Sequence, residues 1–273
     1  MPFDTTELFG VLRDAAQQEI IPRFRALAPA DIAEKSSSID LVTAADLGAE
    51  AMITAALRQR FPTAMILGEE AYAADPHSMN GLSEAELAFV IDPVDGTFNF
   101  AAGNALFGTL LAVVRRGETV AGIIYDPLHG HALLAEKGAG ARMLRPDGSD
   151  VPVRVAAPVP LAQMVSVAVL HYLPEPMRSN AGTALAKVRM SLAYGCSAHE
   201  YWMLNTGRAH FLVGHRMMPW DHLAGTLIHA EAGGHNAHFD GSPYRPGAIE
   251  GGLLCAPDKD SWTAIRREVL GIN

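Results

Sequence analysis

The chain has 273 residues, of which 49% are hydrophobic, and its formal net charge is −9. This length and apolar content provide for one large domain or two smaller lobes with a sizeable core, and they exclude disorder of the whole chain. The acidic excess argues against a surface for nucleic acids or anionic membranes, so an anionic substrate would need local positive charge, which bound metal ions can supply.

The two cysteines, Cys196 and Cys255, form neither a disulfide framework nor a zinc-ribbon spacing, which fits a reducing compartment. The acidic N-terminus lacks the basic region of a signal peptide. No uninterrupted apolar run approaches the roughly 20 residues that span a bilayer. We therefore expect a soluble cytoplasmic protein that binds neither membranes nor nucleic acids.

The first predicted helix spans residues 5–28, because apolar residues recur on one face of this segment. Thr5 or Thr6 can serve as its N-cap. Pro22 should kink or break the helix near its end, since proline lacks the amide proton and clashes with the preceding turn.

A second helix is predicted over residues 43–60, with Thr43 as its N-cap. We expect its apolar stripe to consist of Ala44, Leu47, Ala51 and Leu57. A short strand at 64–67 follows. The polar segment 71–86 is typical of a loop, which is either a mobile flap over a site or an ordinary surface connection.

From residue 107 the sequence predicts an antiparallel meander of short strands and tight turns. The strands of this meander are expected at 108–114, 119–125, 131–136 and 141–144. The polar turn 145–150 is the best internal boundary. We therefore divide the chain into an N-terminal lobe (1–150) with the metal motifs and a C-terminal lobe (151–273) with substrate-contacting segments, which together form one catalytic unit.

Strands and helices alternate in the second half. Strands are predicted at 164–170, 189–193, 209–214 and 252–256, and helices at 175–188, 197–206, 221–232 and 259–270. Ser197 and Glu200 match a capping box, with Ser197 as the N-cap. The helix before Gly233 and Gly234 should stop there, because glycine readily ends a helix.

The most informative motif is DPVDGT at residues 92–97, which follows a buried apolar run. Asp92 and Asp95 flank a turn stiffened by proline, so their carboxylates can point to one side and share cations. The turn exposes a backbone carbonyl, such as that of Val94, and Mg²⁺ prefers oxygen ligands of this kind. If a short helix begins here, the following Gly and Thr offer free N–H groups to a phosphate. The alternative is an ordinary β-turn.

Further charged residues stand at the ends of predicted elements. Taken singly, Glu69 belongs to a solvated strand end, Asp221 is an N-cap, Asp46 compensates the charge of a helix N-terminus, and Lys35 is a surface lysine. Taken together, their chemistry is mutually suited to one metal cluster built from distant parts of the chain.

The ordered set of these motifs resembles the inositol monophosphatase family of metal-dependent, lithium-sensitive phosphomonoesterases. The matching segments are Lys35, Asp40 to Asp46, Gly68 to Glu70, residues 92–97, and Trp220 to Gly234. The resemblance implies a layered αβαβα sandwich of the sugar-phosphatase type, with an antiparallel meander in the N-terminal lobe and a mixed sheet in the C-terminal lobe. It also implies two or three Mg²⁺ ions per active site, a small phosphorylated metabolite as substrate, and a homodimer.

The resemblance also implies roles for individual residues. The metal ligands would be Glu69, Asp92, the carbonyl of Val94, Asp95 and Asp221. Thr97 and Asp46 would orient the attacking water, and Lys35 would neutralise Asp46. The backbone N–H groups of Gly96 and Thr97 would hold the phosphate.

The chain departs from the family where the alcohol half of the substrate would bind. Members that prefer inositol phosphates carry a carboxylate shortly before the Trp-Asp pair, whereas residues 210–219 contain none. His215 and Arg216 either meet a second anionic group of the substrate or form a polar turn. A similar choice between substrate contact and a plain strand-to-helix turn holds for Gly195, Cys196 and Ser197.

We therefore expect a Mg²⁺-dependent phosphomonoesterase acting on inositol-1-phosphate or a related sugar phosphate. The alternative substrates are fructose-1,6-bisphosphate, histidinol phosphate and 3′-phosphoadenosine 5′-phosphate. A non-catalytic regulatory binding protein is the less favoured reading, because a pure binding module would need no complete set of catalytic ligands.

Overall fold

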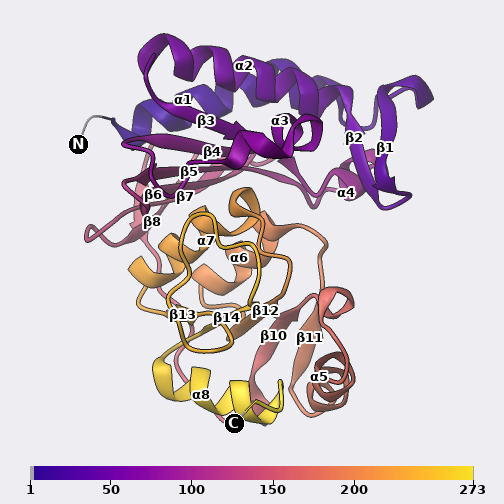
Figure 1. Cartoon of the computed structure of the whole chain (residues 1–273), viewed down its shortest axis with the longest axis vertical. Coiled ribbons are helices and arrows are strands. Elements are labelled where there is room, and N and C mark those ends of the chain that lie inside the picture. Colours follow the sequence, from indigo (N-terminus) through magenta and orange to yellow (C-terminus); the bar gives the residue numbers. More distant parts are fainter. Residues whose placement is uncertain (1–2, 273) are drawn as a thin grey trace.

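The computed structural model describes residues 3–272 and arranges them in five alternating layers of helices and sheets (Figure 1). Three apolar cores separate these layers. One core lies between the N-terminal helices and a seven-stranded sheet, the second between that sheet and a five-stranded sheet, and the third beyond the five-stranded sheet. The predicted αβαβα sandwich is therefore confirmed.

The larger sheet has the strand order β3-β4-β5-β6-β7-β8-β9. Its strands are β3 (Met65–Gly68), β4 (Ala88–Asp95), β5 (Gly108–Arg115), β6 (Glu118–Asp126), β7 (His131–Glu136), β8 (Ala141–Leu144) and β9 (Asp150–Pro152). β3 is parallel to β4, and the other neighbouring pairs are antiparallel, which confirms the predicted meander. All of β4 is buried, with Val90 in one core and Phe89 and Ile91 in the other.

The smaller sheet has the strand order β11-β10-β12-β14-β13 and is mixed. Its strands are β10 (Val165–Ala168), β11 (Met190–Leu192), β12 (Phe211–Gly214), β13 (His235–Ala237) and β14 (Leu253–Ala256). β10 is parallel to both β11 and β12, while β14 is antiparallel to both β12 and β13. β12 therefore lies at the centre of this sheet.

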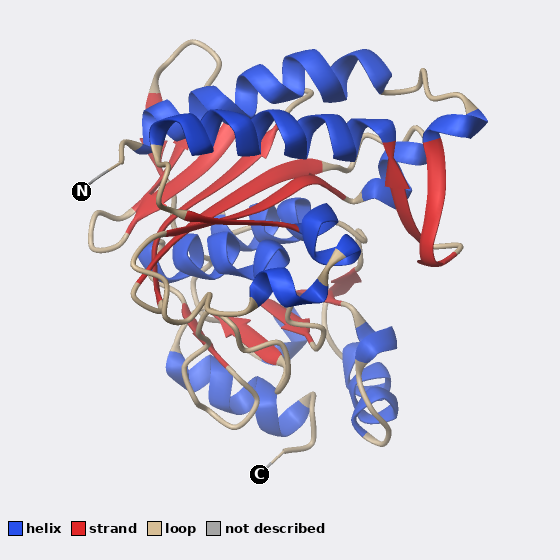
Figure 2. Cartoon of the chain, turned by 45° about the horizontal axis from the view of Figure 1, so that its top comes forward, coloured by secondary structure: helices blue, strands red, loops and turns tan. Residues whose placement is uncertain are grey.

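Helices cover both sheets on their outer faces and fill the space between them (Figure 1). The long helices are α1 (Thr5–Ala15) and α2 (Ala44–Arg60) above the larger sheet, α6 (Ser197–Asn205) and α7 (Pro219–Glu231) between the sheets, and α5 (Met177–Leu185) and α8 (Lys259–Glu268) beyond the smaller sheet. Figure 2 shows a separate hairpin of β1 (Ile32–Ser37) and β2 (Asp40–Thr43) at the side of the larger sheet. Two short helices, α3 (Glu69–Ala74) and α4 (Thr97–Ala101), begin where β3 and β4 end.

Glycines let the middle helices approach the larger sheet and each other closely. A Cβ atom on Gly108 of β5 would lie 2.5 Å from the Cβ of Ala198 on α6. A Cβ atom on Gly225 of α7 would lie 2.3 Å from ring atoms of Tyr201 on α6. Real side chains do not approach so closely, so Gly108 fixes how near α6 lies to β5, and Gly225 fixes how near α7 lies to α6.

The N-terminal helix is shorter than predicted. α1 ends at Ala15, and a π turn (Ala16–Ile20) and a 3₁₀ turn (Ile21–Arg23) follow it, so the helix does not reach residue 28. Its N-cap is Asp4, whose carboxylate accepts a hydrogen bond from the Thr6 N–H at 2.7 Å. The predicted N-caps Thr5 and Thr6 are therefore wrong, because the helix begins at Thr5 and the carboxylate of the preceding Asp4 reaches the free amide.

The predicted buried stripe of α2 is also wrong, although its bounds and its N-cap Thr43 are confirmed. Leu47 is 56% exposed, and the buried face is instead formed by Ala45, Ala49, Ile53 and Leu57. Asp46 and Glu50 are buried beside these residues because each makes hydrogen bonds at the cavity end of the larger sheet. Glu50 bonds to the first turn of α3, a helix that extends to Ala74 and so replaces the start of the loop predicted at 71–86.

Candidate active site

A cavity of about 630 Å³ opens between the two sheets at the ends of β4 and β12. Six of the predicted metal and phosphate residues line it, namely Glu69, Asp92, Asp95, Gly96, Thr97 and Asp221. The predicted substrate residues line it as well, namely Gly195, Cys196, Ser197, His215 and Arg216. Segments that lie far apart in the sequence therefore meet around one space.

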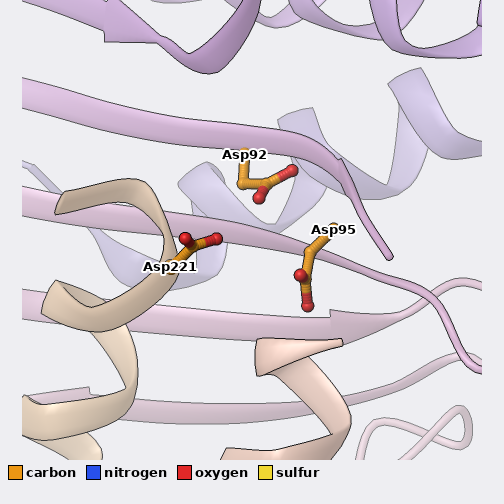
Figure 3. Close-up of side chains that lie close together, drawn as sticks. All are labelled: Asp92, Asp95 and Asp221. Carbon is orange, nitrogen blue, oxygen red and sulfur yellow. The ribbon is translucent and has the colours of Figure 1, made fainter. Parts of the chain in front are cut away.

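Three aspartates converge in this cavity (Figure 3). Asp92 and Asp95 come from β4 and Asp221 from the first turn of α7, and one carboxylate oxygen of each lies within 4.8 Å of the others. Asp92 is 1% exposed, and its Oδ1 has no hydrogen-bond partner among residues 3–272. Burial, with repulsion from Glu69 and Asp95, raises the pKa of Asp92 well above its usual range.

This donor set fits a divalent cation. Two buried carboxylates and a half-buried one repel one another at this spacing, and desolvation also penalises each charge separately. A hard cation such as Mg²⁺ prefers oxygen ligands and would offset both costs. The unpartnered oxygen of Asp92 is the strongest sign of this fit, because buried polar atoms without a partner are rare.

Asp95 holds the N-terminus of α6 in addition to facing the other aspartates. Its carboxylate accepts hydrogen bonds from the N–H groups of Ser197 and Ala198 and from the Cys196 thiol, whose sulfur lies 3.0 Å from Oδ2. The predicted N-cap role of Ser197 is therefore wrong, because a carboxylate from the opposite sheet satisfies the free amides. Cys196 occupies the N-cap position, and its side chain makes no capping bond to the helix.

The turn after β4 leads directly into α4 at Thr97, as expected if a short helix begins there. Gly96 has a φ of 84°, which is the left-handed region that favours glycine. A Cβ atom on Gly96 would lie 2.8 Å from the Leu106 carbonyl oxygen and 3.0 Å from the Cβ of Cys196. Only glycine fits this position without displacing the wall of the cavity.

Thr97 and Asp46 form a hydrogen-bonded pair next to the aspartates. Thr97 Oγ1 lies 2.9 Å from Asp46 Oδ1 and 3.0 Å from the Val94 carbonyl oxygen. The other oxygen of Asp46 accepts hydrogen bonds from the N–H and hydroxyl groups of Thr43. Burial raises the pKa of Asp46 to about 6, although the bonds from Thr43 and Thr97 oppose this shift.

Lys35 pairs with Glu69 and Glu70, since its Nζ lies 2.8 Å from an oxygen of each. In the described part of the chain it forms no direct ion pair with Asp46, and the neutralisation of Asp46 by Lys35 stays a prediction. Desolvation, followed by repulsion from Glu69, raises the pKa of Glu70 to about 7. The lysine therefore offsets the charge of the glutamate pair at the end of β3.

Sequence reasoning missed the roles of two buried glutamates: Glu50 carries no recognisable signal, and Glu200 was noted only as part of a capping box. Glu50 accepts hydrogen bonds from the N–H groups of Glu70 and Ala71 and so fixes the start of α3. Oε1 of Glu200 accepts from the N–H groups of Tyr194 and Gly195, at 3.1 and 3.2 Å. Their positions became apparent only when the fold brought together segments distant in sequence.

Comparison with known proteins agrees with this geometry. The model of the inositol monophosphatase family matches residues 4–269. An inositol-1-monophosphatase of Bacillus subtilis is 29% identical over 78% of this chain and 78% of its own length. A histidinol-phosphatase of Chlorobaculum parvum is 34% identical over 71% of this chain and 70% of its own length. An IMPase structure from Thermotoga maritima matches with a TM-score of 0.78 at 26% identity and covers 98% of both chains.

No helix within residues 3–272 has both the length and the apolar character that a membrane crossing requires.

Proposed function

This chain belongs to the inositol monophosphatase family and is a phosphomonoesterase, and we propose that it uses Mg²⁺ to hydrolyse a small phosphorylated metabolite in the cavity between the sheets. The observation that carries the metal assignment is the convergence of Asp92, Asp95 and Asp221, with an unpartnered oxygen on Asp92. We further propose a cytoplasmic, lithium-sensitive homodimer that binds neither membranes nor nucleic acids.

Five residues would hold the metal ions. Glu69, Asp92 and the carbonyl of Val94 would bind one Mg²⁺, and Asp92, Asp95 and Asp221 would bind a second. A third, weaker site would lie near Glu69. Bound Mg²⁺ supplies Lewis acidity, which lowers the pKa of a water molecule and stabilises charge on the leaving oxygen.

Thr97 and Asp46 would act on the attacking water. The Thr97 hydroxyl donates to Asp46 and can accept a hydrogen bond from a water molecule in the cavity, so it orients that water. Asp46, with a pKa of about 6, is mainly ionised near neutral pH and can take up the proton that Thr97 passes on. The N–H groups of Gly96 and Thr97, at the start of α4, would bind the phosphate.

Substrate choice within this reaction class is part of the proposal. Inositol-1-phosphate and related sugar phosphates are the first candidates, with fructose-1,6-bisphosphate, histidinol phosphate and 3′-phosphoadenosine 5′-phosphate as alternatives. Two of the relatives described above are named for inositol-1-phosphate and histidinol phosphate chemistry. The complete set of acidic and hydroxyl groups in the cavity supports catalysis rather than a purely regulatory binding role.

The test is release of inorganic phosphate from this substrate panel, with Mg²⁺, with EDTA, and with Mg²⁺ plus Li⁺. Asp95→Asn retains an oxygen for one of the two N–H groups of α6, which bind different oxygens of Asp95, and it removes the charge. It should lower kcat by more than about tenfold. Cys196→Ser is the matched control, because it changes the neighbour of Asp95 and keeps a donor. Asp95→Asn activity close to wild type would refute the ligand assignment, and absence of turnover on every monoester would favour the regulatory reading.

A further inference from the structure

A cationic side chain faces the cavity from the segment between β12 and α7. Arg216 is exposed and lines the cavity. Its guanidinium contacts Tyr172, with Nη1 3.5 Å from the phenol oxygen and the central carbon 5.8 Å from the ring centroid. Among residues 3–272, no carboxylate forms an ion pair with Arg216. The guanidinium is therefore held against an aromatic ring with most of its donors free.

Buried contacts fix the backbone that carries this side chain. Nε2 of His222 lies 2.9 Å from the carbonyl oxygen of Arg216, and Nδ1 lies 3.0 Å from the hydroxyl of Tyr201. The carbonyl oxygen of Arg216 can only accept, so Nε2 of His222 donates to it. Arg216 is therefore pre-positioned.

The same wall offers no carboxylate to the hydroxyl groups of a polyol. Residues 210–219 contain no acidic side chain, and Gly214, which ends β12 in the cavity wall, has no side chain at all. A Cβ atom on Gly214 would meet its nearest neighbour, His222 Cε1, at an ordinary 3.5 Å, so packing does not force glycine here. This part of the cavity therefore has room beside a cation.

We propose that the alcohol half of the substrate carries a second anionic group, a phosphate or a carboxylate, which binds to the guanidinium of Arg216. The inference rests on the proposed phosphatase function and specifies which monoesters the same cavity prefers. Guanidinium presents a planar pair of N–H donors that matches two oxygens of either anion. The three aspartates and their cations would hold the phosphate that is cleaved, so the two anions of the substrate would lie at different places in the cavity.

Among the residues of this wall, Arg216 is the one that would distinguish substrates with a second anionic group from substrates without one. His171 also lines the cavity, but burial and then the nearby Arg178 and Arg216 lower its pKa, which leaves it neutral near pH 7. Asp40 faces the cavity from the β1–β2 hairpin and accepts a hydrogen bond from Ser36. Asp40 and Asp221 are carboxylates whose charges act on the Arg216 guanidinium, but neither forms an ion pair with it among residues 3–272.

The experiment compares monoesters that differ in the second anion. The phosphate pair is fructose 1,6-bisphosphate and fructose 1-phosphate, and the carboxylate pair is 2-phosphoglycerate and glycerol 2-phosphate. Wild type should show a higher kcat/KM for the first member of at least one pair, and the preferred pair identifies the anion. Arg216→Gln should lower kcat/KM for that doubly anionic substrate by about tenfold or more and change its partner by no more than about twofold. Arg216→Lys should retain part of the preference.

Arg178→Gln is the matched control, because it removes an equal charge from α5 outside the cavity. The inference would be overturned if Arg216→Gln lowered kcat/KM equally for both members of each pair. It would also be overturned if Arg178→Gln caused the same selective loss of kcat/KM. Either result would leave the phosphatase function intact. Failure of these four esters and of the substrate panel of the proposed function to release phosphate would instead refute that function. Calorimetric binding of fructose 1,6-bisphosphate and fructose 1-phosphate in Ca²⁺ then decides the inference, since only the bisphosphate should weaken in Arg216→Gln.

Discussion

Asp92→Asn should make the metal-free protein more stable while it destroys the metal site. Asp92 is buried, and its Oδ1 makes no hydrogen bond within the described chain, so the substitution removes charge without removing a bond from that oxygen. One oxygen of Asp92 lies within 4.8 Å of oxygens of Asp95 and Asp221. At that separation two unit charges repel by about 3 kcal/mol for an effective dielectric constant of about 20.

Protonation of one carboxyl relieves part of this repulsion in the wild type. We therefore expect Asp92→Asn to raise the free energy of unfolding in EDTA by about 1 to 3 kcal/mol, which is several degrees in Tm for a chain of this size. Mg²⁺ at about 100 times its dissociation constant should stabilise the wild type by about 2.7 kcal/mol, whereas the variant should gain much less. The order of stability should thus reverse when metal is added.

Differential scanning fluorimetry of both proteins in EDTA and in a Mg²⁺ series measures this reversal. Asp40→Asn is the matched control, because it removes an acidic charge from the cavity rim and should leave the Mg²⁺-dependent shift in Tm intact. A variant that is less stable than wild type in EDTA, or that gains as much from Mg²⁺, would refute the electrostatic reasoning.

Three further predictions concern catalysis, packing and pH. Thr97→Val should lower kcat by a factor of roughly 10² to 10⁴ with little change in KM, because it removes the hydroxyl between the water and Asp46. Thr97→Ser should restore much of the activity. A loss confined to KM would contradict this role of Thr97. Gly225→Ala should lower the free energy of unfolding, measured by urea denaturation, by about 1 to 3 kcal/mol, because the new methyl group would collide with Tyr201. Gly10→Ala is the control and should not destabilise the fold, because the space around Gly10 is open. Burial raises the pKa of Glu200 from 4.5 to about 7, so the folded metal-free protein binds a proton more readily than the unfolded chain, and stability should fall as pH rises from about 4.5 past 7. Glu200→Gln should reduce part of this pH-dependent loss of stability. Near pH 5 the variant should be as stable as wild type, because it keeps the oxygen that accepts from both N–H groups. An unchanged dependence of stability on pH would contradict this reasoning.

Local patterns predicted the elements of the fold well because they depend on neighbouring residues. The apolar run before residue 92 forms β4, and the proline and glycine of the DPVDGT motif produce the turn that was expected after it. The meander followed from tight turns between short strands. Six of the predicted metal and phosphate residues then reach one cavity because the ends of these elements meet there.

Predictions failed where a distant partner replaced a local one. Ser197 had a suitable sequence for an N-cap, but Asp95, over a hundred residues earlier, binds the amides of α6. The direct partners of Lys35, Glu69 and Glu70 at the end of β3, were likewise not predicted. Leu47 fitted a helical stripe by spacing alone, whereas the orientation of α2 is set by Asp46 and the small Ala45 and Ala49. Such choices depend on tertiary contacts that periodicity does not contain.

Asp95 joins β4 of the larger sheet to the start of α6, whose chain continues into the smaller sheet, and α7 then supplies Asp221. This connection sets an order of events during folding. Each sheet can form its own hydrogen bonds first, but the three aspartates come together only after α6 and α7 have docked against the larger sheet. Recovery of enzymatic turnover after refolding would therefore time that final docking step, and recovery of helical signal alone would report the earlier ones.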